Sequence, residues 1–549
     1  MLILLTLVVK ISFAQPCHCN HIITNQQTSV SGGPDFQPGD TICIQSGNRD
    51  FLYLNNLHGD SLHYIVFINC GGPVIVQNNY YMYGIKIANS SYFRFTGSGV
   101  DSIKYGIKIL GTAINSNGLS LDNKSTNFEV DHLEIANTGF AGIMAKTDPK
   151  CDLSTNRGVF TLYHPVFHDN YIHETGGEGF YIGHSFYTGY PTSCNGIPDT
   201  LYPHEIKGLR VYHNIVENAH LDGIQIGCAT EDCEIYENTV TGYGVDGIGS
   251  QNPGIQIGGG TTGKCYNNLI SGGTGIGIAI FGTGDNVIFN NVIINAGLNY
   301  FPGDPTKKVY GIFCDDRTTI PGRSFNLVNN TILNPKTDGI RFTSLLSSNN
   351  QIRNNIILHP GSLGSYSDSA RSYINFLEAC SVASTNNYTA PTLAGAGFRD
   401  ILTNNYRLMA GSPAIDSGAD LSLMGVTFDR DDLSRPGYAQ FDIGAFEYHS
   451  ENIWTGIKSS LWGNIENWSK EDTPLPEDDI VIPAGTPFQP VVSINGMVCH
   501  NLTLAADAEI TVYPSASITI SGNLTIEQGA FMNNQGILII KGNLDNHNH

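Results

Sequence analysis

The sequence predicts an all-β protein whose main part is a solenoid of short parallel strands wound into a tube. An asparagine that precedes a short apolar run recurs seven times, at Asn170, Asn214, Asn238, Asn268, Asn291, Asn330 and Asn355. Successive spacings are 44, 24, 30, 23, 39 and 25 residues. About 24 residues therefore form one coil, and the longer intervals carry insertions.

A glycine-led strand follows the asparagine in many units. Examples are Gly179-Phe-Tyr-Ile, Gly223-Ile-Gln-Ile, Gly277-Ile-Ala-Ile and Gly339-Ile-Arg-Phe. Strands in which every second residue is apolar must stack on a neighbour, which here is the same segment one coil later. We expect the asparagine to take a left-handed corner and to bond its neighbours in a column, and the glycine to form the other corner. Long helices are excluded, because 62 of the 549 residues are glycine and β-branched residues fill the periodic positions.

The net charge of the chain limits the classes of ligand that it can be expected to bind. The chain has 28 Lys and Arg against 49 Asp and Glu, which gives a net charge of −21. Nucleic acid is not an expected partner, because its phosphates need compensating cations. Acidic polysaccharides are also disfavoured unless a basic patch or a bound divalent cation reverses the local field, and Ca²⁺ is the cofactor that we would then expect.

The amino terminus and the cysteines indicate export. Residues 1–14, MLILLTLVVKISFA, are apolar and end in a small-x-small pattern, which predicts a signal peptide. No later stretch is apolar enough to span a membrane, so we expect a secreted or cell-surface protein that is monomeric. Twelve cysteines in such a chain suggest disulfides. The expected pairs are Cys228–Cys233, Cys151–Cys194 and Cys43–Cys70.

Two groups of motifs carry a family resemblance. Near the amino end, Pro38-Gly-Asp-Thr-Ile precedes the strand Tyr64-Ile-Val-Phe-Ile. At the other end, SPAIDSG at 412–418 and DRDDLSRP at 429–436 precede Asp442-Ile-Gly-Ala-Phe. Residues 33–448 resemble the right-handed parallel β-helix superfamily, which includes pectate lyases and many exported carbohydrate-processing proteins. The resemblance implies a right-handed parallel β-helix over residues 15–448 and is specific for fold rather than function.

A different composition begins at residue 449. Trp454, Trp462 and Trp468 fall within fifteen residues, and Asn501, Asn523 and Asn543 then recur at spacings of 22 and 20. Residues 449–549 are therefore predicted to form a separate small β-solenoid or β-roll. The tryptophans either cap its core or offer faces for sugar stacking, and we favour the cap.

Aligning the coils predicts columns of side chains. The residue after each Gly-Ile pair should point out of the tube. This gives an outward column of Tyr181, Gln225, Gln256, Ala279, Phe313 and Arg341. Such a column is either a glycan platform or an ordinary polar outer sheet.

Acidic residues precede the turn glycine in several coils, namely Glu178, Asp222 and Asp338, with Asp246 in an alternative register. Coils lie about 4.8 Å apart, so stacked carboxylates would approach the spacing of a glycosidase pair or hold calcium. The competing explanation is that Asp-Gly simply suits a tight corner.

The interval from Asn170 to Asn214 contains the longest local insertion, residues 184–207, rich in Tyr and His. Loops of this length are usually functional or disordered, and this one should overhang Tyr181 and Gln225. Histidines nearby can supply a base or a metal ligand. The segment Tyr202-Pro-His-Glu bears a faint likeness to the DPHE motif of alginate epimerases, but Tyr202 replaces the aspartate, so no role is transferred.

Two functions from different classes remain open. The first is an exported polysaccharide-active enzyme, a lyase, hydrolase or epimerase, with its site around residues 178–225. Its candidate catalytic residues are Glu178, His184, His204, His213 and Asp222, and its candidate substrate-binding residues are Tyr181, Gln225, Gln256 and Arg341. The alternative is a noncatalytic adhesive or structural surface solenoid.

Overall fold

The chain forms two compact units, residues 1–395 and 396–549. The computed structural model describes residues 17–297, 308–361, 372–377, 379–437, 439–449 and 451–548, so the expected signal peptide lies outside the described residues. Residues 396–448, which we predicted to belong to the same domain as the β-helix, lie in the second unit. No helix among the described residues is long and apolar enough to cross a membrane.

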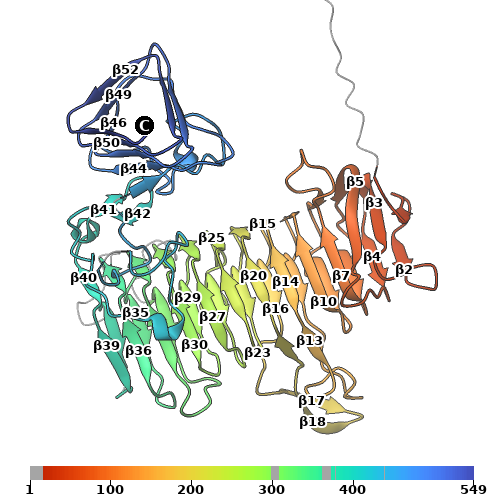
Figure 1. Cartoon of the computed structure of the whole chain (residues 1–549). Helices are drawn as coiled ribbons and strands as arrows, with labels where there is room; N and C mark the ends of the chain where they lie inside the picture. The colour runs from red at the N-terminus through yellow and green to blue at the C-terminus, as the bar shows by residue number, and fades with distance from the viewer. Residues whose placement is uncertain are drawn as a thin grey trace, which may run out of the picture. The chain divides into compact units, whose positions relative to one another are not determined.

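The first unit consists of stacked coils of parallel strands (Figure 1). One sheet of described residues has twelve strands: β2 (Ser29–Ser31), β4 (Leu52–Asn55), β6 (Tyr83–Ala88), β9 (Asn117–Asp122), β12 (Ile143–Ala145), β16 (Phe180–Ile182), β22 (Ile224–Ile226), β26 (Ile255–Ile257), β29 (Ile278–Ile280), β32 (Ile312–Cys314), β35 (Ile340–Phe342) and β38 (Ile374–Phe376). We call it the twelve-stranded sheet.

The larger sheet forms the other walls of the coils. Its strands are β1 (His21–Ile23), β3 (Thr41–Arg49), β5 (Ile65–Val76), β7 (Ser91–Thr96), β8 (Ile107–Ile109), β10 (Thr126–Asp131), β11 (Leu133–Ala136), β14 (Pro165–His168), β15 (Tyr171–His173), β20 (Arg210–Tyr212), β21 (Ile215–Glu217), β24 (Glu234–Tyr236), β25 (Thr239–Thr241), β27 (Gly263–Tyr266), β28 (Leu269–Ser271), β30 (Asn286–Phe289), β31 (Val292–Ile294), β33 (Phe325–Val328), β34 (Thr331–Leu333), β36 (Asn350–Arg353), β37 (Ile356–Leu358), β39 (Val382–Thr385) and β40 (Tyr388–Ala390).

Two small sheets branch from these coils. The first pairs β13 (Thr161–Tyr163), β19 (Glu205–Lys207) and β23 (Ala229–Glu231) in parallel. The second is an antiparallel hairpin of β17 (Tyr190–Cys194) and β18 (Ile197–Leu201), which projects from the coils at the bottom of Figure 1. The hairpin therefore lies within the predicted insertion 184–207.

The asparagine column is confirmed. The seven repeated asparagines, which we call the ladder asparagines, form a column that runs from Asn170 through Asn355 and ends at Asn387. Each one donates from its backbone N–H and its side-chain Nδ2 to the Oδ1 of the next one, at about 3.0 Å. The position that we predicted for the left-handed residue was wrong by one residue. The residue before the asparagine takes the left-handed conformation, as in Asp169, His213 and Glu237.

The role expected for the strand-leading glycines was also wrong. Gly179 and Gly223 are not among the residues with positive φ. A Cβ on Gly179 would lie 2.5 Å from the Gly223 carbonyl oxygen and 2.5 Å from a methyl carbon of Val216. These glycines are required because the next coil and the core leave no room for a side chain.

The interior of the tube is dry and apolar. Ile224, Ile255 and Ile278 stack in register on neighbouring coils, and all are 0% exposed. The same pattern continues along the coils with Ile, Val, Leu and Phe side chains. Because every coil hides its apolar face on the next, the solenoid supplies a rigid outer face.

The disulfides match the predictions in part. The pair Cys151–Cys194 is confirmed. The expected pair Cys43–Cys70 is wrong, because Cys43 bonds Cys19 and Cys70 bonds Cys17. The expected Cys228–Cys233 bond is absent, and both thiols are buried and unbonded.

The second unit begins with the antiparallel pair β41 (Phe398–Asp400) and β42 (Asn405–Leu408). A small parallel β-solenoid follows. One of its faces contains β43 (Glu451–Ile453), β44 (Asp479–Ile482), β47 (Leu502–Leu504), β50 (Leu524–Ile526) and β53 (Leu544–Asn546). The other two contain β45 (Val491–Val492), β48 (Glu509–Val512) and β51 (Phe531–Asn534), and β46 (Met497–Cys499), β49 (Ser517–Ile520) and β52 (Ile537–Ile540). The described residues also include the short 3-10 helices η2 (Leu393–Ala396), at the boundary of the two units, and η3 (Ser422–Met424) and η4 (Ile465–Asn467) in the second.

The three tryptophans cap the core of this solenoid. Trp454, Trp462 and Trp468 are at most 2% exposed and pack against one another. The indole N–H of Trp468 donates to the Trp462 carbonyl oxygen at 2.8 Å. Buried rings cannot stack on a sugar, so the cap is confirmed and the sugar-stacking alternative is wrong.

Candidate functional site

The outward column of the twelve-stranded sheet is present as predicted. Tyr181 pairs with Gln225, and Gln225 with Gln256, on β16, β22 and β26. The column then continues through Ala279, Phe313 and Arg341. Its side chains point away from the core because their strand neighbours point into it.

A groove of about 460 Å³ opens over the start of this column. Its floor is formed by Tyr181, Gln225 and Gln256. Its walls include residues of the 184–207 insertion and of three other segments, namely Ser185, Phe186, Tyr187, Thr188, Ser250, Gln251, Phe281, Arg317 and Thr318. The insertion therefore overhangs Tyr181 and Gln225, as predicted.

A chain of hydrogen bonds orients the floor. Gln256 Nε2 donates to Gln225 Oε1 at 3.0 Å, and Gln225 Nε2 donates to Ser185 Oγ at 3.2 Å. Ser185 Oγ also lies 3.2 Å from the Tyr181 hydroxyl oxygen. Because each group fixes the next, the amides are held in one orientation before any ligand arrives.

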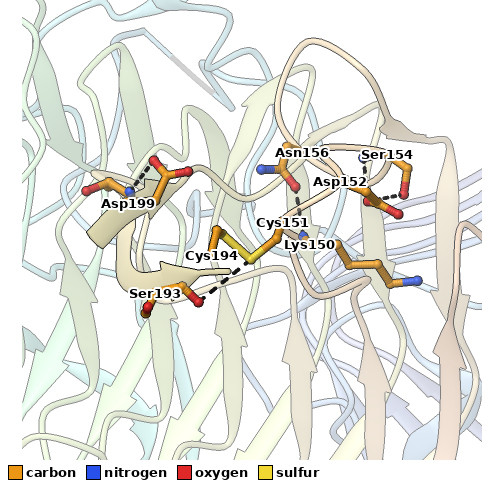
Figure 2. The surroundings of a disulfide bond; sticks show 9 residues. Lys150, Cys151, Asp152, Ser154, Asn156, Ser193, Cys194 and Asp199 are labelled. Atoms are coloured by element: carbon orange, nitrogen blue, oxygen red, sulfur yellow. Dashed lines mark hydrogen bonds between the residues drawn. A yellow bond between two sulfur atoms is a disulfide. The ribbon is translucent and has the colours of Figure 1, made fainter. Parts of the chain in front are cut away.

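The insertion is fastened at two points. The Cys151–Cys194 disulfide ties the hairpin to the preceding coil (Figure 2). The Arg157 guanidinium lies 4.0 Å from the ring centroid of Tyr187 and 5.5 Å from that of Tyr202. These contacts hold the wall of the groove against the coils.

A second pocket of about 330 Å³ lies beside the insertion and shares Phe186 with the groove. It is lined by Lys146, Asp148, Pro149, His184, Phe186, Tyr190 and Pro203. His184 Nε2 donates to the Thr147 carbonyl oxygen at 3.0 Å. Burial lowers the pKa of His184 to about 4, so its imidazole is neutral at neutral pH.

His204 lies behind this pocket. Its ring centroid is 5.7 Å from that of His184, and the side chain is fully buried. His204 Nε2 accepts the Thr147 N–H at 3.1 Å, while Nδ1 donates to the Glu205 carbonyl oxygen at 3.0 Å. Burial lowers its pKa to about 4. Both ring nitrogens are engaged with backbone, so His204 holds the chain in place.

Glu178 and Asp222 do not line the groove. Their exposed fractions are 1% and 0%, and burial raises the pKa of each. Asp338 occupies the equivalent position further along. Asp246 does not, because the Gly223 N–H donates to Pro253 at that position and Asp246 instead pairs with His220 at 2.9 Å.

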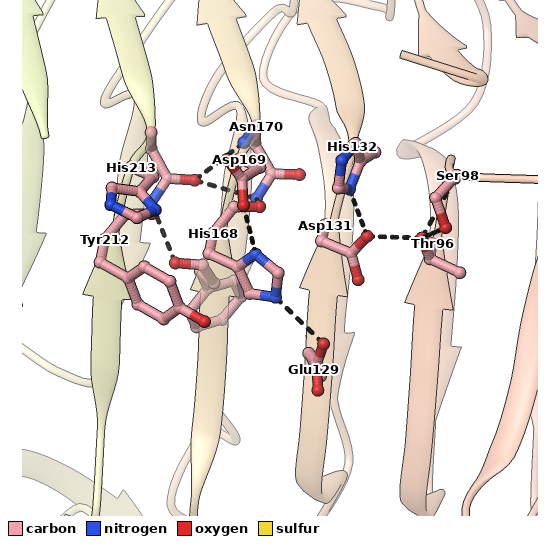
Figure 3. Close-up of polar contacts among 12 residues, drawn as sticks. Thr96, Ser98, Glu129, Asp131, His132, His168, Asp169, Asn170, Tyr212 and His213 are labelled. Carbon is pink, nitrogen blue, oxygen red and sulfur yellow. Dashed lines mark hydrogen bonds and ion pairs between the residues drawn. The ribbon is translucent and has the colours of Figure 1, made fainter. Parts of the chain in front are cut away.

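His213 lies elsewhere, on a corner beside the larger sheet (Figure 3). An ion pair with Glu237 raises its pKa. Grouping it with the other four candidate catalytic residues was wrong. The structure brings those four together only as two pairs, His184 with His204 and Glu178 with Asp222.

Figure 3 also shows a polar cluster outside the predicted site. Ligand atoms of Glu129, Asp131 and His168 lie within 4.8 Å of one another. Arg94 Nε is 3.1 Å from Glu129 Oε1 and 2.8 Å from Asp131 Oδ2. Burial disfavours charged His168, but hydrogen bonds to Glu129 and Asp169 outweigh it and raise its pKa. Arg94 and His168 already pair with these carboxylates, so the cluster is a satisfied ion network.

Arg341 continues the column but lies outside the groove. Its guanidinium is 3.6 Å from Asp338 and 5.0 Å from the Tyr310 ring centroid. Sequence reasoning missed Phe281 and Arg317, which are stacked at 3.9 Å at the groove wall. The sequence contained one signal, the CDDR segment around Arg317, but no pattern placed it near Tyr181.

Comparisons with known proteins agree with the architecture. Residues 203–390 match the family model of the right handed beta helix region. Residues 453–549 match the model of a domain of unknown function, DUF8693. A comparison with curated proteins found no match.

Several solved structures are similar at low identity. The pectate lyase Pel9A is 14% identical over 79% of this chain and 97% of its own, with a TM-score of 0.37. The PL6 family alginate lyase AlyGC is 15% identical over 95% and 78%, with a TM-score of 0.37. The GH136 lacto-N-biosidase from Eubacterium ramulus is 10% identical over 68% of each chain, with a TM-score of 0.42. These values carry no argument about activity.

The strand register and the matched family model lead to one conclusion about the architecture. The first unit of this chain is a right-handed parallel β-helix, and a small β-solenoid follows it in the second.

Proposed function

We propose that this protein binds a glycan on the outer face of its β-helix, in the groove over Tyr181, Gln225 and Gln256. The observation that carries the proposal is the combination of oriented amides on the floor with aromatic side chains on the walls. Amides exchange hydrogen bonds with sugar hydroxyls, and aromatic faces pack against the apolar faces of sugar rings. Arg317 is the cation that lines this groove.

Binding is tested with a panel of neutral and uronic-acid polysaccharides, with and without calcium. Tyr181→Ala should weaken binding about tenfold or more, because it removes an aromatic face. Tyr181→Phe should retain most of the affinity. Arg341→Ala is the matched control, since Arg341 lies in the same column outside the groove. Equal affinities for Tyr181→Ala and the wild type would argue against the groove as the binding site.

A second candidate function is processing of the glycan by a lyase, hydrolase or epimerase. It is favoured by one observation, the pocket in which Lys146, Asp148 and a neutral His184 meet next to the groove. A neutral imidazole can accept a proton. Incubation with the same panel, followed by assays for reducing ends, 4,5-unsaturated products and epimerised sugars, tests it. Products that disappear in His184→Ala support catalysis, whereas binding without product supports the adhesive alternative.

Export is part of the same proposal. Three disulfides are present among the described residues, and disulfides are typical of proteins outside the cytosol. Detection of the protein in the medium or on the cell surface, with an amino terminus near Gln15, tests this directly. Recovery of the uncleaved chain from the cytosol would contradict it.

A further inference from the structure

Two buried carboxyl side chains are stacked on neighbouring coils with few hydrogen-bond donors. The Gly142 N–H donates to the Glu178 carbonyl oxygen and the Gly179 N–H to that of Asp222, so the two acids are in register on neighbouring coils. Their exposed fractions are 1% and 0%. Glu178 Oε2 and both oxygens of Asp222 have no hydrogen-bond partner among the described residues.

Few neighbouring groups offset the cost of burying these two carboxyls in ionised form. The same register places Ala141 before the pair and Pro253 after it, and neither side chain can donate a hydrogen bond. Lys146 is the cation whose charge favours ionised Glu178, whereas the charge that acts on Asp222 is that of Glu178 itself. The ion pair of His220 and Asp246 occupies the adjoining loop. Two ionised carboxylates are strongly disfavoured here, because burial and mutual repulsion act in the same direction.

Asp338 occupies the same position in a later coil, and burial raises its pKa as well, but it has hydrogen-bond donors and a cation beside it. It is equally buried, but its Oδ1 accepts the Ser372 N–H at 2.7 Å and its Oδ2 accepts Asn375 Nδ2 at 3.0 Å. Arg341 lies 3.6 Å away. Donors and a cation therefore surround Asp338, whereas Asp222 has neither.

We propose that Glu178 and Asp222 form a buried acid pair that holds at least one proton at neutral pH and so keeps the groove floor in place. Tyr181 and Gln225 each lie three residues further along the same chain segments. Loss of the proton would put two like charges close to these side chains and loosen them. The predicted effect on ligand binding rests on the proposed function, whereas the predicted protonation of the acid pair does not.

The sign of the pH dependence follows from the raised pKa of both groups. The folded state keeps a proton over a pH range in which the unfolded chain has lost it. The stabilisation is therefore complete below about pH 4, where unfolded carboxyls are also protonated. It is lost progressively as the pH rises toward the raised folded pKa.

The test compares Asp222→Asn with the matched control Asp338→Asn in the full chain. Thermal unfolding is followed by far-UV circular dichroism from about pH 5 to about pH 9, with and without EDTA. The wild-type midpoint should fall as the pH rises. Asp222→Asn should flatten this dependence and unfold at a higher temperature than the wild type at the alkaline end. Asp338→Asn should lower the midpoint at every pH, because this carboxyl accepts two hydrogen bonds and faces Arg341.

Two results would overturn the proposal. One is an Asp222→Asn midpoint below the wild type at every pH with an unchanged slope. The other is a drop on adding EDTA that Asp222→Asn abolishes, which would mean that the pair holds a cation instead of a proton.

A second measurement does not depend on the unfolding midpoints. The infrared band of a protonated carboxyl should be present in the wild type at neutral pH and weaker in Asp222→Asn, and an unchanged band would contradict the acid pair. If a ligand for the groove is found, its affinity should fall with rising pH in the wild type and not in Asp222→Asn. If none is found, the unfolding and infrared results still decide whether the proton is there.

Discussion

The ladder asparagines show how one residue type fixes the corner of a coil. Asn268 accepts from the N–H and the Nδ2 of Asn238 and donates to Asn291 Oδ1. Its Nδ2 also reaches the carbonyl oxygens of Ile235 and Tyr266. Each ladder asparagine therefore bonds its own corner and both neighbouring coils.

We expect Asn268→Ala to destabilise the first unit by at least about 3 kcal/mol, because several buried groups would each lose a partner at about 1–3 kcal/mol. Asn326→Ala is the control, since Asn326 makes one 3.3 Å side-chain bond outside the ladder. Urea unfolding followed by circular dichroism measures both. Similar losses in the two variants would contradict a special role for the ladder.

Arg317 is expected to contribute directly to glycan affinity. Its guanidinium covers the Phe281 ring at the groove wall. Arg317→Ala should weaken binding of a groove ligand about threefold to tenfold, since a hydrogen bond to the ligand worth about 0.5–1.5 kcal/mol would be lost. Arg323→Ala, outside the groove, should bind like the wild type. Isothermal titration calorimetry measures both, and an unaffected Arg317→Ala would remove this residue from the site.

The residue scale also shows the limit of reading conformations from sequence. The columns of Asn, Tyr and Gln followed from spacing alone. The left-handed residue could not be located, because an Asn-rich corner offers two candidates in pairs such as Asn267-Asn268. Glycine was assigned to a corner because its usual role is conformational, whereas here the contact with the next coil excludes any side chain.

At the scale of elements, the insertion 184–207 was predictable and its partners were not. Its length and composition identified it, and the coil alignment placed it over Tyr181. The rest of its lining comes from residues 250–251, 281 and 317–318, which are distant in sequence. Only the stacking of five coils brings them to one groove.

The disulfide of the insertion should matter for binding and little for the β-helix. In Cys151→Ser/Cys194→Ser the hairpin β17–β18 loses its covalent tie to the coil. Amide exchange in residues 184–201 should rise, and groove affinity should fall, while the midpoint of the coils changes little. Cys19→Ser/Cys43→Ser is the control, because that bond lies at the amino end. Unchanged exchange in the insertion would show that Arg157 alone suffices to hold it.

At the scale of the whole molecule, each unit has its own hydrophobic core. All three tryptophans lie in the second unit. Tryptophan fluorescence therefore reports the unfolding of the second unit, whereas circular dichroism reports both. We expect two transitions in urea, with fluorescence following one of them. Coincident curves from both probes, with a single transition, would contradict independent unfolding.

The sequence by itself determined the solenoid, the asparagine column, the outward column and the position of the insertion, because these follow from local periodicity. Only the tertiary structure decided which of the candidate catalytic residues lie close together. Five proposed catalytic residues separated into two pairs and a distant histidine, since they lie at corners and loops of neighbouring coils that face different directions. It also buried Glu178 and Asp222 side by side on neighbouring coils, where burial and the scarcity of donors, which no spacing reveals, favour a retained proton.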